Sequence, residues 1–196
     1  MPNTNLDEPL ALFRRWYGEA EKREIDVPSA MSVATVDARN RPSSRMVLLK
    51  HFDENGFVFY TNLESRKADC IAKNAHVSLL FHWKSLKRQV RIEGTAALVE
   101  DAMADAYFAS RDRGSQIGAW ASRQSRPMEG RFELEKEVAR YAAKFGVATV
   151  PRPHFWSGYR VTPDHFEFWD DGKFRLHERT VFDRSDNGWN TQRLFP

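Results

Sequence analysis

The sequence has few of the residues and runs that mark disulfide-bonded, metal-binding and membrane proteins. Its single cysteine, Cys70, excludes an internal disulfide and suits a reducing compartment. The six histidines show no metal-ligand spacing, and no apolar run approaches the roughly 18 residues of a membrane span. The first residues lack the basic and apolar regions of a signal peptide. We therefore expect a cytoplasmic protein with no bound metal and no membrane association.

Sequence motifs of several enzyme classes are missing as well. There is no G-x-S-x-G, no glycine-rich dinucleotide fingerprint and no Walker sequence. The formal net charge of +3 favours a small anionic ligand, because nucleic-acid binding usually needs a concentrated basic stripe. The basic segment Arg123–Arg126 lacks the interleaved aromatic residues of an RNA-stacking surface. A nucleic-acid partner is therefore not expected.

Aromatic residues, in contrast, make up 13% of the 196 residues, and the chain is long enough to bury a sizeable core. We expect one folded domain over residues 9–196, preceded by a flexible tail at residues 1–8. Helices are expected at residues 9–24, 65–74, 101–111 and 132–145. Strands are expected at residues 31–36, 46–49, 57–60, 76–83, 88–99, 156–161, 165–169, 174–182 and 189–194. Short strands with helices inserted between them predict a mainly β fold, an antiparallel barrel or sandwich.

The stretch from Arg45 to Lys67 reads as a strand, a tight turn at residues 53–56, a second strand and the start of a helix. Ser65 is the expected N-cap of that helix. Arg66 and Lys67 then occupy its first turn, where the helix dipole is positive and acidic residues are preferred. Two cations at this point outline a phosphate site. The alternative is that both side chains extend into solvent.

A second cationic cluster lies near the C-terminus. In an extended strand over residues 174–182, the period of two would put Arg175, His177 and Arg179 on one face. Such a face could hold an anionic planar ligand, with His177 available for proton transfer and Trp169 for stacking. A solvated strand face and a core tryptophan are the alternatives.

A phosphate monoester would also suit the side chains of the expected helix at residues 101–111. Tyr107 and Arg111 are four residues apart and share a face. Ser115 follows one turn later if the helix continues past Gly114. A phenol, a guanidinium and a hydroxyl in one direction fit a phosphate, and a purely structural role is the alternative.

Several segments, in order along the chain, resemble the pyridoxine (pyridoxamine) 5′-phosphate oxidase family, a group of flavin enzymes. They are R-M-V-L-L-K at 45–50, V-F-Y-T-N at 58–62, S-R-K-A at 65–68, V-S-L-L-F at 77–81, R-Q-V at 88–90, Y-F-x-S-R at 107–111, S-Q-I-G-A-W at 115–120, Q-S at 124–125, F-W-S-G-Y-R at 155–160, E-F-W at 167–169, R-L-H-E-R at 175–179 and R-L-F-P at 193–196. The resemblance implies an antiparallel split barrel of Greek-key type. It also implies a homodimer with flavin mononucleotide (FMN) at the subunit interface.

The resemblance further implies roles for individual residues. The residues expected to contact FMN are Arg45, Met46, Val47, Leu48, Leu49, Lys50, Tyr60, Thr61, Arg66, Lys67, Gln89, Gln124, Ser125, Trp169 and Arg179. Those expected to bind the substrate are Lys50, Tyr107, Arg111, Ser115, Arg175, Leu176 and His177. Among these, Arg175 and His177 are the expected catalytic residues, which orient the reacting carbon.

The implied reaction is the oxidation of pyridoxamine 5′-phosphate or pyridoxine 5′-phosphate by dioxygen to pyridoxal 5′-phosphate, with release of hydrogen peroxide. Hydride passes from the exocyclic carbon of the substrate to flavin N5. Two alternatives are a split-barrel flavin reductase with another substrate and a non-catalytic module that binds pyridoxal phosphate.

The chain departs from the family pattern at three places. Longer relatives carry an arginine-rich N-terminal arm that closes over the substrate, and Arg14, Arg15 and Tyr17 are not expected to replace it. Val27 stands where relatives tend to have an acidic residue, and Asp170 after Trp169 is unusual. We expect these differences to alter rate or substrate preference and to leave flavin binding intact.

Overall fold

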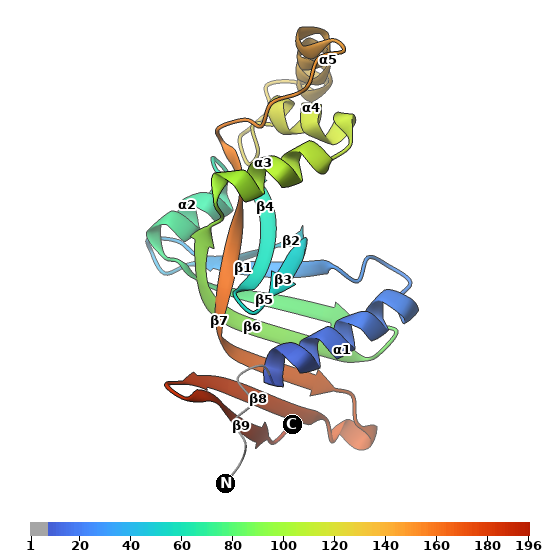
Figure 1. The fold of residues 1–196 in the computed structure, drawn as a ribbon, viewed down its shortest axis with the longest axis vertical. Helices are drawn as coiled ribbons and strands as arrows, with labels where there is room; N and C mark the ends of the chain where they lie inside the picture. The colour runs from blue at the N-terminus through green and yellow to red at the C-terminus, as the bar shows by residue number, and fades with distance from the viewer. Residues whose placement is uncertain (1–7) are drawn as a thin grey trace.

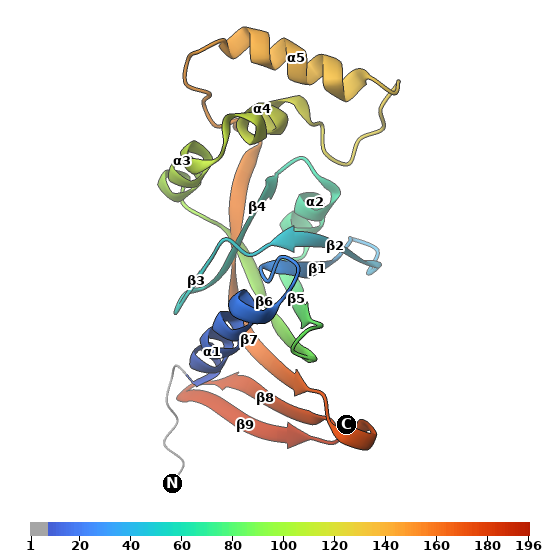
Figure 2. The same cartoon turned by 90° about the vertical axis from the view of Figure 1, so that its right-hand side faces the viewer.

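The computed structural model describes residues 8–196, and within this range nine strands form one antiparallel sheet (Figures 1 and 2). The strands are β1 (Ala30–Val36), β2 (Pro42–Leu48), β3 (His51–Asp53), β4 (Gly56–Asn62), β5 (His76–Trp83), β6 (Arg88–Leu98), β7 (Trp156–Asp170), β8 (Glu178–Ser185) and β9 (Gly188–Leu194). The helices are α1 (Glu8–Arg23), α2 (Arg66–Lys73), α3 (Asp101–Ser110), α4 (Arg113–Ala121), α5 (Glu133–Phe145) and a short 3₁₀ turn, η1 (Lys173–Arg175). The mainly β, antiparallel prediction is confirmed.

The strand order is β2-β1-β5-β6-β7-β4-β3, with β8 on β7 and β9 on β8. The long strand β7 pairs with β6 along its length, with β4 through its first part and with β8 through its last part. A register shift at Glu93/Gly94 in β6 lets the sheet curl. A Cβ on Gly94 would lie 2.1 Å from the carbonyl oxygen of Thr162, so only glycine allows this close approach.

The core is filled by aromatic side chains from α1 and the curled sheet. Phe13 of α1 is fully buried. Its ring centroid lies 4.9 Å from that of Phe57, 5.2 Å from that of Phe81 and 5.0 Å from that of Phe52. Each such pair contributes about 0.5–1.5 kcal/mol beyond the burial of its area. The packing of α1 therefore fixes the concave face of the sheet.

The two ends of the molecule carry different elements. Helices α3, α4 and α5 gather at one end, and β8 and β9 lie at the other (Figures 1 and 2). Strand β7 connects the two ends, because Trp156 packs against Phe108 of α3 while Trp169 pairs with Arg179 of β8. At about 3.3 Å per residue, the 13 steps between these tryptophans span up to roughly 40 Å.

Several predictions about local structure were accurate. The expected first helix starts at Glu8, one residue before the predicted boundary, and residues 1–7 of the predicted tail lie outside the described residues. Ser65 is the N-cap of α2, and its side chain accepts a hydrogen bond from the backbone N–H of Ala68. Strand β5 has the predicted bounds and buries the predicted alternate residues Val77, Leu79, Phe81 and Trp83.

Other predictions were wrong. No strand spans residues 174–182: Arg175 lies in η1, and β8 begins only at Glu178, so Arg175 and Arg179 do not share a strand face. The expected strands at 156–161 and 165–169 are one strand, β7. No helix or strand was expected between residues 112 and 131, and α4 lies there. The turn at 53–56 joins β3 to β4, whereas β2 pairs with β1.

Helix α5 forms where a helix was predicted, but little of its apolar surface is buried. None of its residues is fully buried, and Leu134 and Val138 are among the exposed large apolar side chains. Only Tyr141, Ala142 and Phe145 pack against a small apolar cluster around Trp156. Its helical period was correct, because periodicity depends on local sequence, but the number of packing partners depends on the tertiary structure.

Candidate functional site

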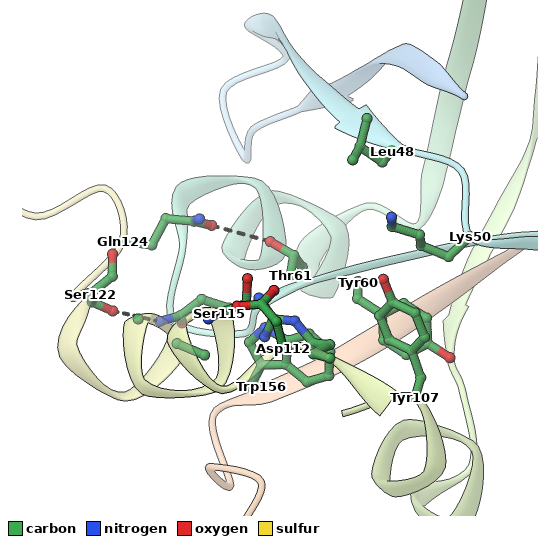
Figure 3. A pocket seen from close by; sticks show the side chains of 14 residues that line it. Leu48, Lys50, Tyr60, Thr61, Tyr107, Asp112, Ser115, Ser122, Gln124 and Trp156 are labelled. Atoms are coloured by element: carbon green, nitrogen blue, oxygen red, sulfur yellow. Dashed lines mark hydrogen bonds between the residues drawn. The ribbon is translucent and has the colours of Figure 1, made fainter. Parts of the chain in front are cut away.

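A cavity of about 580 Å³ opens between β4 and helices α3 and α4 (Figure 3). It is lined by Leu48, Lys50, Tyr60, Thr61, Asn62, Tyr107, Arg111, Asp112, Ser115, Gly118, Ala119, Ser122, Gln124 and Trp156. Seven of these, the residues at positions 48, 50, 60, 61, 107, 111 and 115, belong to the predicted site, and Gln124 is an eighth. The cavity therefore collects residues from segments up to about a hundred positions apart.

Stacked rings form one wall of this first cavity. Tyr60 of β4 stacks on Tyr107 of α3, with ring centroids 4.0 Å apart, and on Trp156 of β7 at 5.2 Å. The ammonium of Lys50 lies 6.0 Å from the ring of Tyr107, and the guanidinium of Arg111 lies 4.8 Å from the ring of Trp156. Two cations thus rest on an aromatic wall, which fixes their position without neutralising them.

Arg111 has an unpaired guanidinium nitrogen that could bind an anion. Its Nη1 atom is buried and has no hydrogen-bond partner within the described residues. Burial lowers the pKa of this guanidinium, which marks the cost of holding a charge without a counter-ion. Ser115 is the third residue of α4, and its backbone N–H donates to the side chain of the N-cap Asp112. An anion that met Arg111 and the Ser115 hydroxyl would relieve this unpaired donor.

Helix α3 ends at Ser110, so Tyr107, Arg111 and Ser115 do not lie on one continuous helix. The chain turns at Arg111 and Asp112 and restarts as α4. All three residues nevertheless line the same cavity, because the turn brings the start of α4 back toward the end of α3. The predicted grouping is therefore correct although the predicted helix is too long.

A second cavity of about 440 Å³ adjoins the first at Tyr60, Thr61 and Gln124, which line both. Its other lining residues are Arg45, Met46, Val47, Arg66, Lys67 and Ser125. Every one of its lining residues belongs to the predicted FMN site. Arg45 is held by hydrogen bonds from its guanidinium to Thr35 Oγ1 at 2.8 Å and Ser43 Oγ at 2.7 Å. The two cavities thus form one composite hollow with two cationic ends.

Lys67 at the start of α2 is the most constrained cation of the second cavity. It is only 7% exposed, and its ammonium donates hydrogen bonds to Thr61 Oγ1 at 2.7 Å, Ser65 Oγ at 3.2 Å and Gln124 Oε1 at 2.6 Å. Burial, and after it the charge of Arg45, lowers the pKa of Lys67 to about 8. No carboxylate offsets this charge among those contacts, which is the condition under which an anionic ligand binds tightly.

The depressed pKa of Lys67 predicts a pH dependence of stability in the flavin-free protein. Between pH 8 and the unfolded value of 10.5 the unfolded state binds more protons, so stability should rise with pH in this window. Between pH 7 and pH 10, the free energy of unfolding of the wild type should rise by about 2–3 kcal/mol relative to that of Lys67→Met. This value follows from about 1.4 kcal/mol per unit of pKa shift. Denaturant unfolding at several pH values measures this difference in the free energy of unfolding. A difference between the two proteins that did not change with pH would contradict the lowered pKa of Lys67.

The remaining predicted residues lie at the other end of β7. Gln89, Trp169 and Arg179 are register partners on three neighbouring strands, so they form a row across β6, β7 and β8. Arg179 is held by its Nε, which donates to the buried carboxylate of Glu167 at 2.6 Å, and Glu167 also accepts from Arg91 at 2.7 Å. These ion pairs lower the pKa of Glu167 although burial opposes them. The carboxylate therefore fixes the direction of Arg179.

The predicted catalytic residues belong to the loop between β7 and β8. His177 lies against Trp169, with ring centroids 4.5 Å apart. Arg175 is exposed and adopts a positive φ of 66°, as does its neighbour Phe174 at 58°. Backbone in this region is strained for residues other than glycine, and such strain concentrates at functional sites. Leu176 is also exposed, at 68%.

Within one chain, the predicted site is therefore split in two. The composite hollow contains the predicted residues of β2, β4, α2, α3 and α4, whereas Gln89, Trp169, Arg175, Leu176, His177 and Arg179 lie at the far end of β7. Leu49 reaches neither cavity, because its side chain is buried in the core. Arg45 lines the second cavity and Lys50 lines the first.

Comparison with known proteins gives the family. Residues 18–145 match the family model described as pyridoxamine 5′-phosphate oxidase, and residues 156–196 match the model of the pyridoxine 5′-phosphate oxidase C-terminal dimerisation region. The chain belongs to the pyridoxamine 5′-phosphate oxidase family. It is 60% identical to a pyridoxine/pyridoxamine 5′-phosphate oxidase of Caulobacter vibrioides, over 100% of this chain and 88% of the relative. It is 56% identical to one of Rhodospirillum rubrum, over 96% of each chain.

Solved structures of the pyridoxamine 5′-phosphate oxidase family and its relatives support the fold. The crystal structure of PhzG from Burkholderia lata, in complex with tetrahydrophenazine-1-carboxylic acid, has a TM-score of 0.90 and 31% identity, and covers 100% of this chain and 94% of that one. An FMN-binding protein from Nostoc punctiforme related to pyridoxamine 5′-phosphate oxidase has a TM-score of 0.77 at 16% identity, over 94% of this chain and 97% of that one. The split-barrel prediction is therefore confirmed.

Sequence reasoning missed two residues that contact the predicted site residues. Trp156 lines the first cavity and supports Arg111, and Glu167 holds Arg179. Both lie inside segments that carried the family resemblance, F-W-S-G-Y-R and E-F-W. In the described part of the chain, no cluster of three or more histidine, cysteine or acidic residues could hold a metal. No helix in that part is long and apolar enough to span a bilayer, and the cytoplasmic location stays a prediction.

Proposed function

We propose that this chain oxidises pyridoxamine 5′-phosphate and pyridoxine 5′-phosphate with dioxygen to pyridoxal 5′-phosphate, using bound FMN. The observation that carries the proposal is the composite hollow, whose two cationic ends share a floor of Tyr60, Thr61 and Gln124. Two phosphorylated flat molecules that must meet face to face need such a hollow, with one phosphate bound at each end. Family membership and the identity to named oxidases support the same activity.

The second cavity suits the phosphate of FMN. Arg45, Arg66 and Lys67 supply three cations, and the N-terminus of α2, the positive end of the helix dipole, lies at the same place. The fit rests on Lys67, a buried ammonium that lacks a carboxylate among its hydrogen-bond partners. When bound, FMN supplies the two-electron chemistry and the reaction with dioxygen. The protein itself binds the reactants, orients them and shields them from water.

The first cavity suits the phosphate of the substrate. Arg111 offers an unpaired guanidinium nitrogen, and Lys50, Tyr107 and Ser115 line the same space. Charge-assisted hydrogen bonds of this kind contribute about 1.5–3 kcal/mol each. Binding energy from the phosphate, far from the reacting carbon, holds the ring in a productive position.

We further propose that the active protein is a homodimer in which each site combines the hollow of one chain with Trp169, Arg175, His177 and Arg179 of the other. Two observations support this arrangement. The second group lies up to roughly 40 Å from the first along β7. The C-terminal residues 156–196 match a dimerisation region. An isologous pair of chains would bring both halves together twice.

Mixing of two inactive variants tests the composite site. Arg111→Ala alters the hollow and Arg175→Ala alters the loop, so each homodimer should be nearly inactive. Random refolding of equal amounts should give heterodimers that contain one intact site, and about a quarter of wild-type activity. The measurement is peroxide release with pyridoxamine 5′-phosphate after mixing.

Matched refolding of each variant alone is the control. Recovery of no activity in the mixture, with heterodimers demonstrated by differential tags, would mean that each site is built within one chain. A yellow protein that failed to oxidise either phosphorylated vitamer would contradict the proposed reaction and favour a flavin reductase with another substrate.

A further inference from the structure

The segment between α5 and β7 contains a proline–arginine–proline sequence to which the proposed function gives no role. Arg152 stands between Pro151 and Pro153, whose rings fix φ at about −65°. The side chain of Arg152 is only 14% exposed. The carbonyl oxygen of Pro151 accepts a hydrogen bond from the indole N–H of Trp120 in α4 at 2.8 Å. The segment 151–153 is therefore stiff and tied to α4.

Each nitrogen of the Arg152 guanidinium donates a hydrogen bond. Nε donates to Oδ1 of Asp105 at 2.5 Å, and Nη2 donates to Oδ1 of Asp101 at 2.7 Å. Nη1 donates to the backbone carbonyl of Trp156 at 2.8 Å. Asp101 and Asp105 are four residues apart and share one face of α3. One guanidinium therefore bridges the start of α3 to the start of β7.

Few buried side chains anchor α3 to the rest of the chain. Ala104 and Phe108 are its buried residues, out of ten. Phe108 packs edge-on against Trp156, with ring centroids 5.1 Å apart. Exposed ion pairs hold little by themselves, but Arg152 is mostly buried and binds with all three nitrogens. The bridge therefore fixes the start of α3, and Phe108 fixes its end.

The three elements that meet at the segment 151–153 are also three walls of the first cavity (Figure 3). Tyr107 comes from α3, Ser115 from α4 and Trp156 from β7. Arg111, at the turn between α3 and α4, has its guanidinium 4.8 Å from the ring of Trp156. A shift of α3 would move Tyr107 and Arg111 relative to Ser115, and small displacements of this kind weaken binding.

We propose that Arg152 is a positioning residue that holds α3 against β7 and thereby keeps the groups that bind the substrate phosphate in register. Arg152 lines neither cavity, so it acts through α3. Its loss should weaken binding of the phosphate and leave the flavin site and the loop of Arg175 unchanged. This inference rests on the proposed function, in which the first cavity binds the phosphate of the substrate.

Substitutions on either side of the bridge test the contact. Arg152→Met keeps most of the side-chain stem and removes the donors. Asp101→Ala combined with Asp105→Ala removes two acceptors at exposed positions, and so tests the same contact even if Arg152→Met folds poorly. Arg152→Lys keeps the charge without the fork of donors. Arg140→Met is the matched control, because Arg140 pairs with Glu137 within α5 and lines neither cavity.

Binding of 4-deoxypyridoxine and of its 5′-phosphate to the FMN-loaded protein isolates the phosphate, because neither compound has an oxidisable group on the reacting carbon. By calorimetric titration, Arg152→Met should bind the phosphorylated compound about tenfold more weakly, the effect of roughly one charge-assisted hydrogen bond, and the other compound equally well. The double aspartate variant should match Arg152→Met, Arg152→Lys should be intermediate, and Arg140→Met should match wild type. KM for pyridoxamine 5′-phosphate should rise about tenfold in Arg152→Met, with kcat and FMN affinity within about twofold.

Unchanged affinity for the phosphorylated compound in Arg152→Met would overturn the proposal. Equal losses in Arg152→Met and Arg140→Met, or weaker binding of both compounds, would also overturn it, because charge or folding in general would then be responsible. A wild-type protein that preferred the phosphorylated compound and released no peroxide would contradict the proposed reaction alone. A wild-type protein with no preference would contradict the phosphate site of the first cavity, and the role of Arg152 with it.

Discussion

Arg66→Ala combined with Lys67→Ala is expected to weaken FMN binding by about 10²–10⁴-fold, from two charge-assisted hydrogen bonds of about 1.5–3 kcal/mol each. Both side chains line the second cavity at the start of α2, and Lys67 is buried among neutral partners. Without them, only Arg45 and the helix N-terminus remain to hold a phosphate. Purified double variant should be pale, and fluorescence titration with FMN measures the loss.

An adjacent basic pair on another helix provides the control. Lys22 and Arg23 end α1 and are exposed, so Lys22→Ala combined with Arg23→Ala makes the same change of net charge away from both cavities. This control should bind FMN as wild type does. FMN affinity in Arg66→Ala/Lys67→Ala equal to that of the control would show that the helix start is not the phosphate anchor.

Arg175→Ala is expected to lose turnover by about 10²–10³-fold while it retains FMN. The fold-change is that of removing one charge-stabilising donor from a reacting centre. Arg175 is exposed, lies outside both cavities and occupies a strained turn, so its removal should change neither the core nor the flavin phosphate site. The flavin spectrum and the melting temperature should match wild type, and peroxide release from pyridoxamine 5′-phosphate should fall.

Lys173, an exposed cation two residues earlier in the same loop, gives the matched control. Lys173→Ala removes the same charge and should keep most of the turnover. Equal losses in both variants would indicate a general effect of loop charge, and loss of flavin in Arg175→Ala would indicate that the residue supports the cofactor.

The elements that were predicted well are those whose signal is local. The Ser65 cap, the alternation of β5 and the helical period of α5 each depend on residues within about one turn or strand of one another. The strand predicted through Arg175 failed because the 171–177 loop is closed by Gly172 and by contacts to Lys87 and His177. These contacts lie within the loop or reach the β5–β6 turn at Lys87, and a pattern of alternating residues contains no information about them.

By itself, the sequence determined the family and most of the secondary structure. Cations next to the Ser65 cap and the spacing of Tyr107 and Arg111 predicted phosphate sites, which stay predictions. Only the tertiary structure decided where these groups meet. Lys67 and Gln124 are 57 residues apart and share one hydrogen bond, because α2 and the loop after α4 pack together.

The tertiary structure also decided that the predicted catalytic loop lies away from the hollow, at the far end of β7. A single long strand carries Trp156 of the first cavity and Trp169 of the loop region, and the rigidity of a paired strand keeps them apart. Spacing along a sequence cannot show this separation. A family resemblance covers segments whether or not they touch each other in the folded chain.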